Sequence, residues 1–225
     1  MRDPEPPPGA CCFDEWAAQN AKRARSKETV APITTALLAA LEAEGLEGRT
    51  ILDVGCGTGD LALAALAHGA ARAHGFDLGE GSIEHANGLA RERGLEERAV
   101  FVVADGSVAP LPASDVVVLN RVICCYPDAR GLLDHTLDAA GSVYAVSAPI
   151  DRGLAGLTNR VLGRIANAWY AMRPAKFRGF RVFLHDLRDV ERRIADAGFF
   201  PTTQERCRFV WQFAVYVRPD PRASR

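Results

Sequence analysis

The chain lacks an excess of charge of either sign. Its 225 residues carry 27 Lys and Arg against 28 Asp and Glu, which gives a formal net charge of −1. Nucleic-acid-binding proteins usually carry a basic excess, so this balance excludes a general electrostatic attraction to nucleic acid. We therefore predict no nucleic-acid partner.

Long apolar runs are also missing. The longest uninterrupted one, Leu61 to Ala67, is far shorter than the roughly 20 residues that a membrane-spanning helix needs. The first nine residues are rich in proline and acids and lack the apolar core of a signal peptide. We therefore expect a soluble, cytoplasmic protein without a transmembrane segment.

The six cysteines lack the C-x-x-C spacing of a typical zinc site. A reducing cytoplasm disfavours disulfides, and we predict no metal ion. One alternative concerns the adjacent pairs Cys11-Cys12 and Cys124-Cys125. If the N-terminal segment folds over the site, these thiols could approach one another and bind a soft metal or a trivalent metalloid. The other interpretation is that they are small buried apolar residues.

Nearly half of the residues are apolar and about a quarter are charged, as expected for one globular domain of this length. Residues 1–12 are predicted to be a flexible, proline-rich leader, and 13–225 a single domain. Within it, 13–45 has a helical pattern interrupted near Pro32. Its second helix has apolar residues at helical spacing and ends at Gly45.

After Arg49, short apolar runs alternate with helical stretches, which predicts an α/β fold with a doubly wound parallel sheet buried on both faces. The predicted strands are 50–54, 73–77, 99–104, 115–120 and 142–148, and the predicted helices are 60–67, 82–93 and 128–140. A further helix at 186–197 precedes two closely spaced strands, 206–209 and 212–217. Such a pair indicates an antiparallel edge.

A glycine-rich turn, Gly55-Cys-Gly-Thr-Gly59, follows the first predicted strand. Glycines allow a tight turn and a close approach of a ligand to the backbone, and the next helix offers free N–H groups. A dinucleotide-binding fingerprint would have a small residue where Asp60 stands. An NAD-dependent oxidoreductase is therefore only our third hypothesis.

Acids stand at the ends of the next two strands. Asp77 is placed to accept hydrogen bonds from both hydroxyls of a ribose, and Asp105 to accept one from an adenine amine. Either acid alone would also suit a simple turn. Together with the glycine-rich turn they predict a nucleoside site, because ligands bind at the carboxyl ends of such strands.

Between residues 30 and 217, the chain resembles the class I S-adenosylmethionine (SAM)-dependent methyltransferases. The resemblance rests on Asp53-Val-Gly-Cys-Gly-Thr-Gly59, Asp77 and Ala104-Asp105. It implies SAM as cofactor and a Rossmann-like, seven-stranded sheet whose last strand is antiparallel. The implied cofactor-binding residues are Asp53, Gly55, Cys56, Gly57, Thr58, Gly59, Asp77, Leu78, Asp105, Gly106 and Asn120.

Within this class, the segment Asn120-Arg-Val-Ile-Cys-Cys-Tyr-Pro-Asp128 is similar to the equivalent stretch of magnesium-protoporphyrin O-methyltransferases and related bacterial proteins. The short segment Phe13-Asp-Glu-Trp16 is loosely similar too. This likeness does not establish the acceptor.

Three residues are candidates for catalysis. Arg121 is expected to clamp an anionic acceptor, Tyr126 to form a wall of the acceptor pocket, and His185 to act as a base if the acceptor is a hydroxyl. A carboxylate acceptor is already ionised and needs no base. The Asn/Asp-Pro-Pro-aromatic loop that goes with adenine or amide nitrogen acceptors is missing here. A surface, packing or capping role is the alternative for each of the three candidates.

The segment 152–181 contains seven basic residues and no acid. Apolar residues recur in it at spacings of three and four, which predicts a basic amphipathic helix. Such an insert suits an apolar, anionic acceptor or an anionic membrane surface. The alternative is a helix packed on the sheet with a solvated basic face.

We therefore predict a SAM-dependent methyltransferase that acts on a small, anionic molecule, with O-methylation favoured. The alternative is a non-catalytic SAM-sensing module that uses its basic helix as a partner or membrane surface. The sequence leaves the oligomeric state open.

Overall fold

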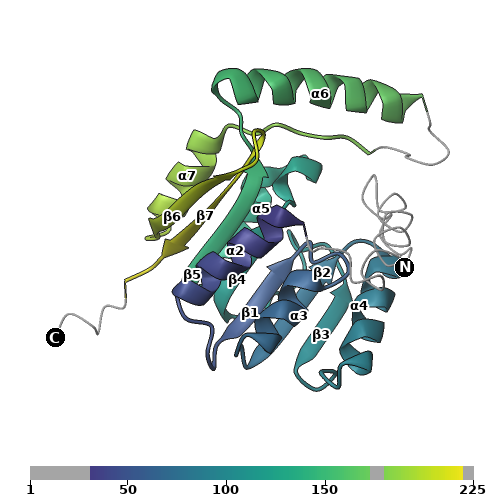
Figure 1. Cartoon of the computed structure of the whole chain (residues 1–225), viewed down its shortest axis with the longest axis vertical. Helices are drawn as coiled ribbons and strands as arrows, with labels where there is room; N and C mark the ends of the chain where they lie inside the picture. The colour runs from purple at the N-terminus through teal and green to yellow at the C-terminus, as the bar shows by residue number, and fades with distance from the viewer. Residues whose placement is uncertain (1–30, 173–179, 220–225) are drawn as a thin grey trace.

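The computed structural model describes residues 31–172 and 180–219, which fold around one seven-stranded sheet (Figure 1). The strand order is β3-β2-β1-β4-β5-β7-β6, in which β7 alone runs antiparallel to both of its neighbours. The strands are β1 (Thr50–Val54), β2 (Arg72–Asp77), β3 (Ala99–Val103), β4 (Ser114–Asn120), β5 (Ala140–Pro149), β6 (Phe200–Cys207) and β7 (Trp211–Val217). The predicted Rossmann-like fold is confirmed.

Helices cover both faces of the sheet. The helices α2 (Pro32–Ala43), α3 (Asp60–Ala67) and α4 (Glu80–Glu92) pack on one face, and α5 (Ala129–Asp138) and α7 (Leu187–Asp196) on the other. Successive side chains of a strand point to opposite faces, so Ile51 of β1 enters the first core and Leu52 the second. Burial on both sides explains why the central strands are almost continuously apolar.

The N-terminal helix matches its prediction. Ile33, Leu37, Leu38 and Leu41 of α2 are buried, Pro32 stands in its first turn, and Gly45 beyond its end has a φ of +83°. The remainder of the predicted helical region, residues 13–30, and the predicted leader 1–12 lie outside the described residues. So do Cys11 and Cys12, and their predicted approach to the second cysteine pair stays a prediction.

The prediction for the first C-terminal strand is wrong at both ends. We expected 206–209, but β6 spans Phe200–Cys207, and Arg208 has a φ of +58° in the turn that follows. This strand lies at the edge of the sheet and pairs only with β7, and most of its side chains are exposed. An edge strand needs no apolar alternation, so the pattern gave no signal for its first six residues.

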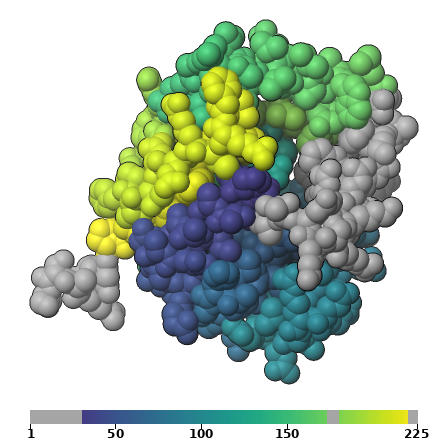
Figure 2. Space-filling model, viewed as in Figure 1, coloured from purple at the N-terminus to yellow at the C-terminus, as the bar shows by residue number. Residues whose placement is uncertain are grey.

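The predicted insert forms a long helix, α6 (Gly153–Ala171), which projects from one end of the molecule and lies on its surface (Figure 1 and Figure 2). Only Ala155 and Gly156 of this helix are buried. Its apolar face is exposed, so the alternative of a helix packed on the sheet through that face is wrong. In the described part of the chain, no helix has the length and apolar character of a membrane span.

Candidate active site

The glycine-rich turn is fixed by its packing and by its backbone. The N–H groups of Gly55 and Cys56 donate to the carbonyl of Phe76 on β2, at 2.6 and 3.0 Å. Gly55 has a φ of +73°, and a Cβ placed on it would lie 2.4 Å from Cγ2 of Val122. Gly57 also has a positive φ, but a Cβ there would meet no atom within 4 Å. The turn therefore presents bare backbone to open space beside Gly57.

Asp77 holds this turn from the end of β2. One of its carboxylate oxygens accepts a hydrogen bond from the N–H of Gly57 at 2.8 Å, and the other accepts one from Gly79 at 2.9 Å. The carboxylate also lines the adjacent cavity. Asp77, the acid predicted to bind a ribose, thus lies next to the glycine-rich turn.

Asp53 lies beneath the turn and is 1% exposed. On β1 it stands between Gly75 of β2 and Val118 of β4. Burial, followed by the charges of Asp77 and Asp60, raises the pKa of Asp53 to about 7. Its Oδ1 atom has no hydrogen-bond partner among the described residues. A positive charge close to this buried carboxyl group would lower its pKa.

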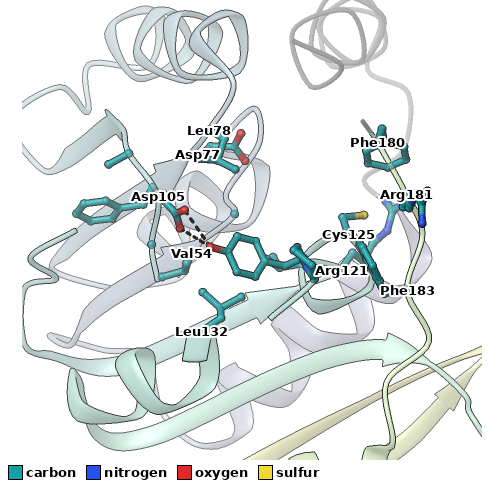
Figure 3. A pocket seen from close by; sticks show the side chains of 17 residues that line it. Val54, Asp77, Leu78, Asp105, Arg121, Cys125, Leu132, Phe180, Arg181 and Phe183 are labelled. Carbon is teal, nitrogen blue, oxygen red and sulfur yellow. Dashed lines mark hydrogen bonds between the residues drawn. The ribbon is translucent and has the colours of Figure 1, made fainter. Parts of the chain in front are cut away.

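Asp105 is hydrogen-bonded to Tyr126, and dashed lines mark these hydrogen bonds in Figure 3. The Tyr126 hydroxyl donates to the two carboxylate oxygens of Asp105, at 3.0 and 2.9 Å, and lies 2.6 Å from the hydroxyl oxygen of Ser107. The N–H of Ser107 donates to the same carboxylate at 2.9 Å. Burial is the main cause that raises the pKa of Tyr126. The sequence gave no sign of this contact between two predicted site residues.

A cavity of about 280 Å³ lies along the carboxyl ends of the strands. Residues of the predicted cofactor site line one end, and Figure 3 shows a second group of lining residues, from later segments, at the other end. The first group contains Gly55, Asp77, Leu78, Asp105 and Gly106, and the second contains Arg121, Cys125, Phe180, Arg181 and Phe183. The predicted cofactor residues Asp53, Cys56, Gly57, Thr58, Gly59 and Asn120 do not line this cavity.

Arg121 follows β4 in a strained conformation, with a φ of +65°. Its N–H donates to the Ser147 hydroxyl at 2.8 Å, and its guanidinium carbon lies 5.4 Å from the centre of the Trp211 ring. The neighbouring Asn120 is held by Ser147 and by Thr34 of α2, at 2.8 and 2.9 Å. Asn120 therefore ties α2 to the sheet, while Arg121 lines the adjacent cavity.

His185 is not among the residues that line the cavity. Its Nε2 lies 3.0 Å from the carbonyl oxygen of Tyr126, and because that oxygen only accepts, Nε2 is the donor. Its ring stacks on Phe183 at 6.0 Å between centres. In this arrangement His185 secures the segment after α6, and its predicted role as a base stays a prediction.

Of the second cysteine pair, Cys125 lines the cavity in the same group as Arg121. The two Sγ atoms of Cys124 and Cys125 are 3.5 Å apart, and the hydrogen bond between them is the main cause that lowers the pKa of the Cys125 thiol. Within residues 31–172 and 180–219, no group of three or more His, Cys, Asp or Glu side chains is arranged to hold a metal ion.

Residues 51–139 match the family model of a methyltransferase domain. This central part of the chain is thus similar to a methyltransferase domain. Ribosomal protein L11 methyltransferase of Pectobacterium atrosepticum is 44% identical over 138 residues, which are 61% of this chain and 43% of that protein. The enzyme of the same name from Serratia proteamaculans is 43% identical over 112 residues, 45% of this chain and 38% of that protein. The chain thus spans less than half the length of these curated relatives.

Solved structures support the same fold. Magnesium protoporphyrin IX methyltransferase from Synechocystis, crystallised with S-adenosylhomocysteine, aligns with a TM-score of 0.67 at 22% identity and covers 90% of this chain and 94% of its own. A [4+2]-cyclase aligns with a TM-score of 0.60 at 20% identity, over 81% of this chain and 80% of its own. The resemblance to class I SAM-dependent methyltransferases is confirmed, and the cyclase shows that this fold alone does not fix the reaction.

Proposed function

We propose that this methyltransferase transfers the methyl group of SAM to a small anionic acceptor, with an oxygen as the favoured acceptor atom. The observation that carries the proposal is the cavity, which has two acids at one end and two arginines at the other. Arg121 and Arg181 line the second end together with Phe180 and Phe183. An anion with an apolar body matches these side chains in charge and in character.

The residues at the first end fit SAM. The open space beside Gly57 admits a ligand against bare backbone, Asp77 suits the ribose hydroxyls, and Asp105 suits the adenine amine. A cationic ligand group near the glycine-rich turn would stabilise the ionised form of the buried Asp53, whose pKa burial raises. When bound, SAM supplies a methyl group on a sulfonium, so the protein mainly has to align the acceptor with it.

The choice between acceptor oxygens follows from the groups near the arginines. A hydroxyl benefits from a base, but His185, the base predicted from sequence, donates to the carbonyl of Tyr126 and does not line the cavity. A carboxylate is ionised at neutral pH and needs only to be bound and oriented. We therefore favour a carboxylate that Arg121 and Arg181 hold.

A protein acceptor is the second candidate, because several relatives are named ribosomal protein L11 methyltransferases. A third candidate, the SAM-sensing module, requires the same cofactor site but no acceptor. The cytoplasmic location also stays a prediction. Transfer of labelled methyl groups separates all three candidates in one assay.

The assay uses SAM labelled on its methyl group with a panel of porphyrin carboxylates, small aromatic carboxylates, phenols and purified ribosomal protein L11. We expect a carboxylate to be methylated. Arg121→Gln should lower kcat/KM roughly 10- to 100-fold through loss of a charge-assisted contact, with little change in SAM affinity. The matched control is Arg206→Gln on the exposed edge strand β6, which removes the same charge away from the cavity.

Three outcomes would contradict the proposal. Methylation of ribosomal protein L11 alone would favour the protein acceptor. SAM binding without transfer to any acceptor would favour the sensing module. Equal activity of the Arg121→Gln variant and the wild type would show that Arg121 does not hold the acceptor.

A further inference from the structure

The outer side of α6 carries an apolar stripe, which we define as Leu154, Leu157, Val161, Ile165, Trp169 and Met172. These side chains are between 39% and 73% exposed. They recur every three or four residues, and at about 3.6 residues per turn they share one side of the helix. Isolated exposed apolar residues are ordinary, but a continuous stripe of six marks an interaction surface.

Polar contacts on the opposite side of α6 hold the helix to the protein. The side-chain N–H groups of Asn159 donate to the carbonyls of Ile150 and Val210, at 2.8 and 2.9 Å. Asn167 exchanges two hydrogen bonds with Val182, at 2.9 and 2.7 Å. The helix is thus fixed with its apolar stripe directed outward, and the exposure is a property of the folded domain.

The positive charge near the stripe indicates that its partner is anionic. From residue 152 to residue 185 the sequence holds seven basic side chains and no acid. Arg164 is exposed close to the stripe and forms no ion pair with another described residue. An apolar face with a tryptophan and a basic flank is the pattern of helices that lie in the surface of an anionic membrane.

We propose that the apolar stripe of α6 binds the surface of a bilayer that contains anionic lipid, with the helix parallel to the membrane plane. The 19 residues of α6 extend over roughly 28 Å, so the stripe offers a long, narrow contact that suits the interface better than a compact protein partner. The stripe enters the boundary between headgroups and acyl chains, while Arg164 pairs with phosphate groups beside it. This proposal does not depend on the reaction.

The test is co-sedimentation of the full chain with vesicles. We expect binding to vesicles of phosphatidylcholine mixed with phosphatidylglycerol, weaker binding to phosphatidylcholine alone, and loss of the difference in high salt. The triple variant Leu157→Gln, Val161→Gln, Ile165→Gln should bind the mixed vesicles at least about 10-fold more weakly. The matched control carries Val108→Gln, Phe200→Gln and Phe209→Gln, which change exposed apolar residues elsewhere.

Circular dichroism melting curves test whether both variants fold. We expect both to fold because all six substituted side chains are exposed. Equal vesicle binding by the wild type and the triple variant would overturn the proposal. So would a wild type without preference for anionic vesicles. If the wild type does not bind vesicles but forms a dimer that the triple variant abolishes, as measured by analytical ultracentrifugation, the stripe serves self-association instead.

Discussion

The buried carboxyl group of Asp53 links the stability of the domain to pH. Its pKa is about 7 in the folded protein, against about 3.9 in an unfolded chain. Between these values the unfolded chain loses the proton and the folded protein keeps it. The unfolded state then binds fewer protons, so the free energy of unfolding falls as the pH rises from about 4 to about 7, and it levels off above that.

The size of this effect follows from the gap between the two pKa values. It corresponds to roughly 4 kcal/mol over the whole range, of which roughly 2.5 kcal/mol falls between about pH 5 and about pH 8. In Asp53→Asn, an amide of nearly the same shape replaces the carboxyl group and does not titrate. Any fixed cost of burying the amide is the same at each pH and cancels when wild type and variant are compared across pH.

Urea unfolding of the wild type and of Asp53→Asn at several values between about pH 5 and about pH 8 measures the effect. We expect the stability of the wild type relative to the variant to fall by roughly 2.5 kcal/mol across this range. Asp115→Asn is the control, because hydrogen bonds from Thr50 lower the pKa of Asp115 and keep it ionised throughout. A constant difference between wild type and Asp53→Asn would refute the reasoning.

Two further predictions concern the turn and the acceptor. Gly55→Ala should lose more stability in urea than Gly57→Ala, because both have a positive φ but only the first Cβ would clash, with Val122; equal losses would contradict the packing explanation. With a carboxylate acceptor, His185→Ala should change the rate by less than about 10-fold and leave the pH–rate profile flat above about pH 5. A rate loss of roughly 10² to 10⁴, with a limb near pH 6 to 7 in the wild type, would instead establish a hydroxyl acceptor and a histidine base.

The central fold was predictable because its strands are buried on both faces. Runs such as Val116 to Leu119 have to be apolar wherever helices cover both sides of a parallel sheet. The edge strand β6 follows a different rule. It is held by backbone pairing to β7, which leaves little trace in residue type, and its sequence Phe200–Cys207 is mostly polar.

The sequence predicted those site residues whose positions follow from the order and direction of the strands alone. Asp77 ends β2 and Asp105 lies just beyond the end of the neighbouring parallel strand β3, so the fold brings them to one cavity whatever their side chains contact. The hydrogen bonds between Tyr126 and Asp105 depend on how the chain turns after β4. The spacing of residues in the sequence does not predict that turn. The place of Phe180 and Phe183 in the cavity depends likewise on where an extended segment returns after α6.

If SAM binds as proposed, the hydroxyl of Tyr126 couples the two ends of the cavity thermodynamically. The side chain stands on the acceptor side, its carbonyl accepts from His185, and its hydroxyl occupies the carboxylate of Asp105. A ligand amine that takes Asp105 as its acceptor competes with this hydroxyl, and a displaced ring reshapes the wall that the acceptor meets. An acceptor that favours one position of the ring therefore changes the affinity of the protein for the nucleoside. By linkage, the nucleoside changes the affinity for the acceptor by the same factor. The position of one aromatic ring therefore sets the sign and the size of the coupling between the two ligands.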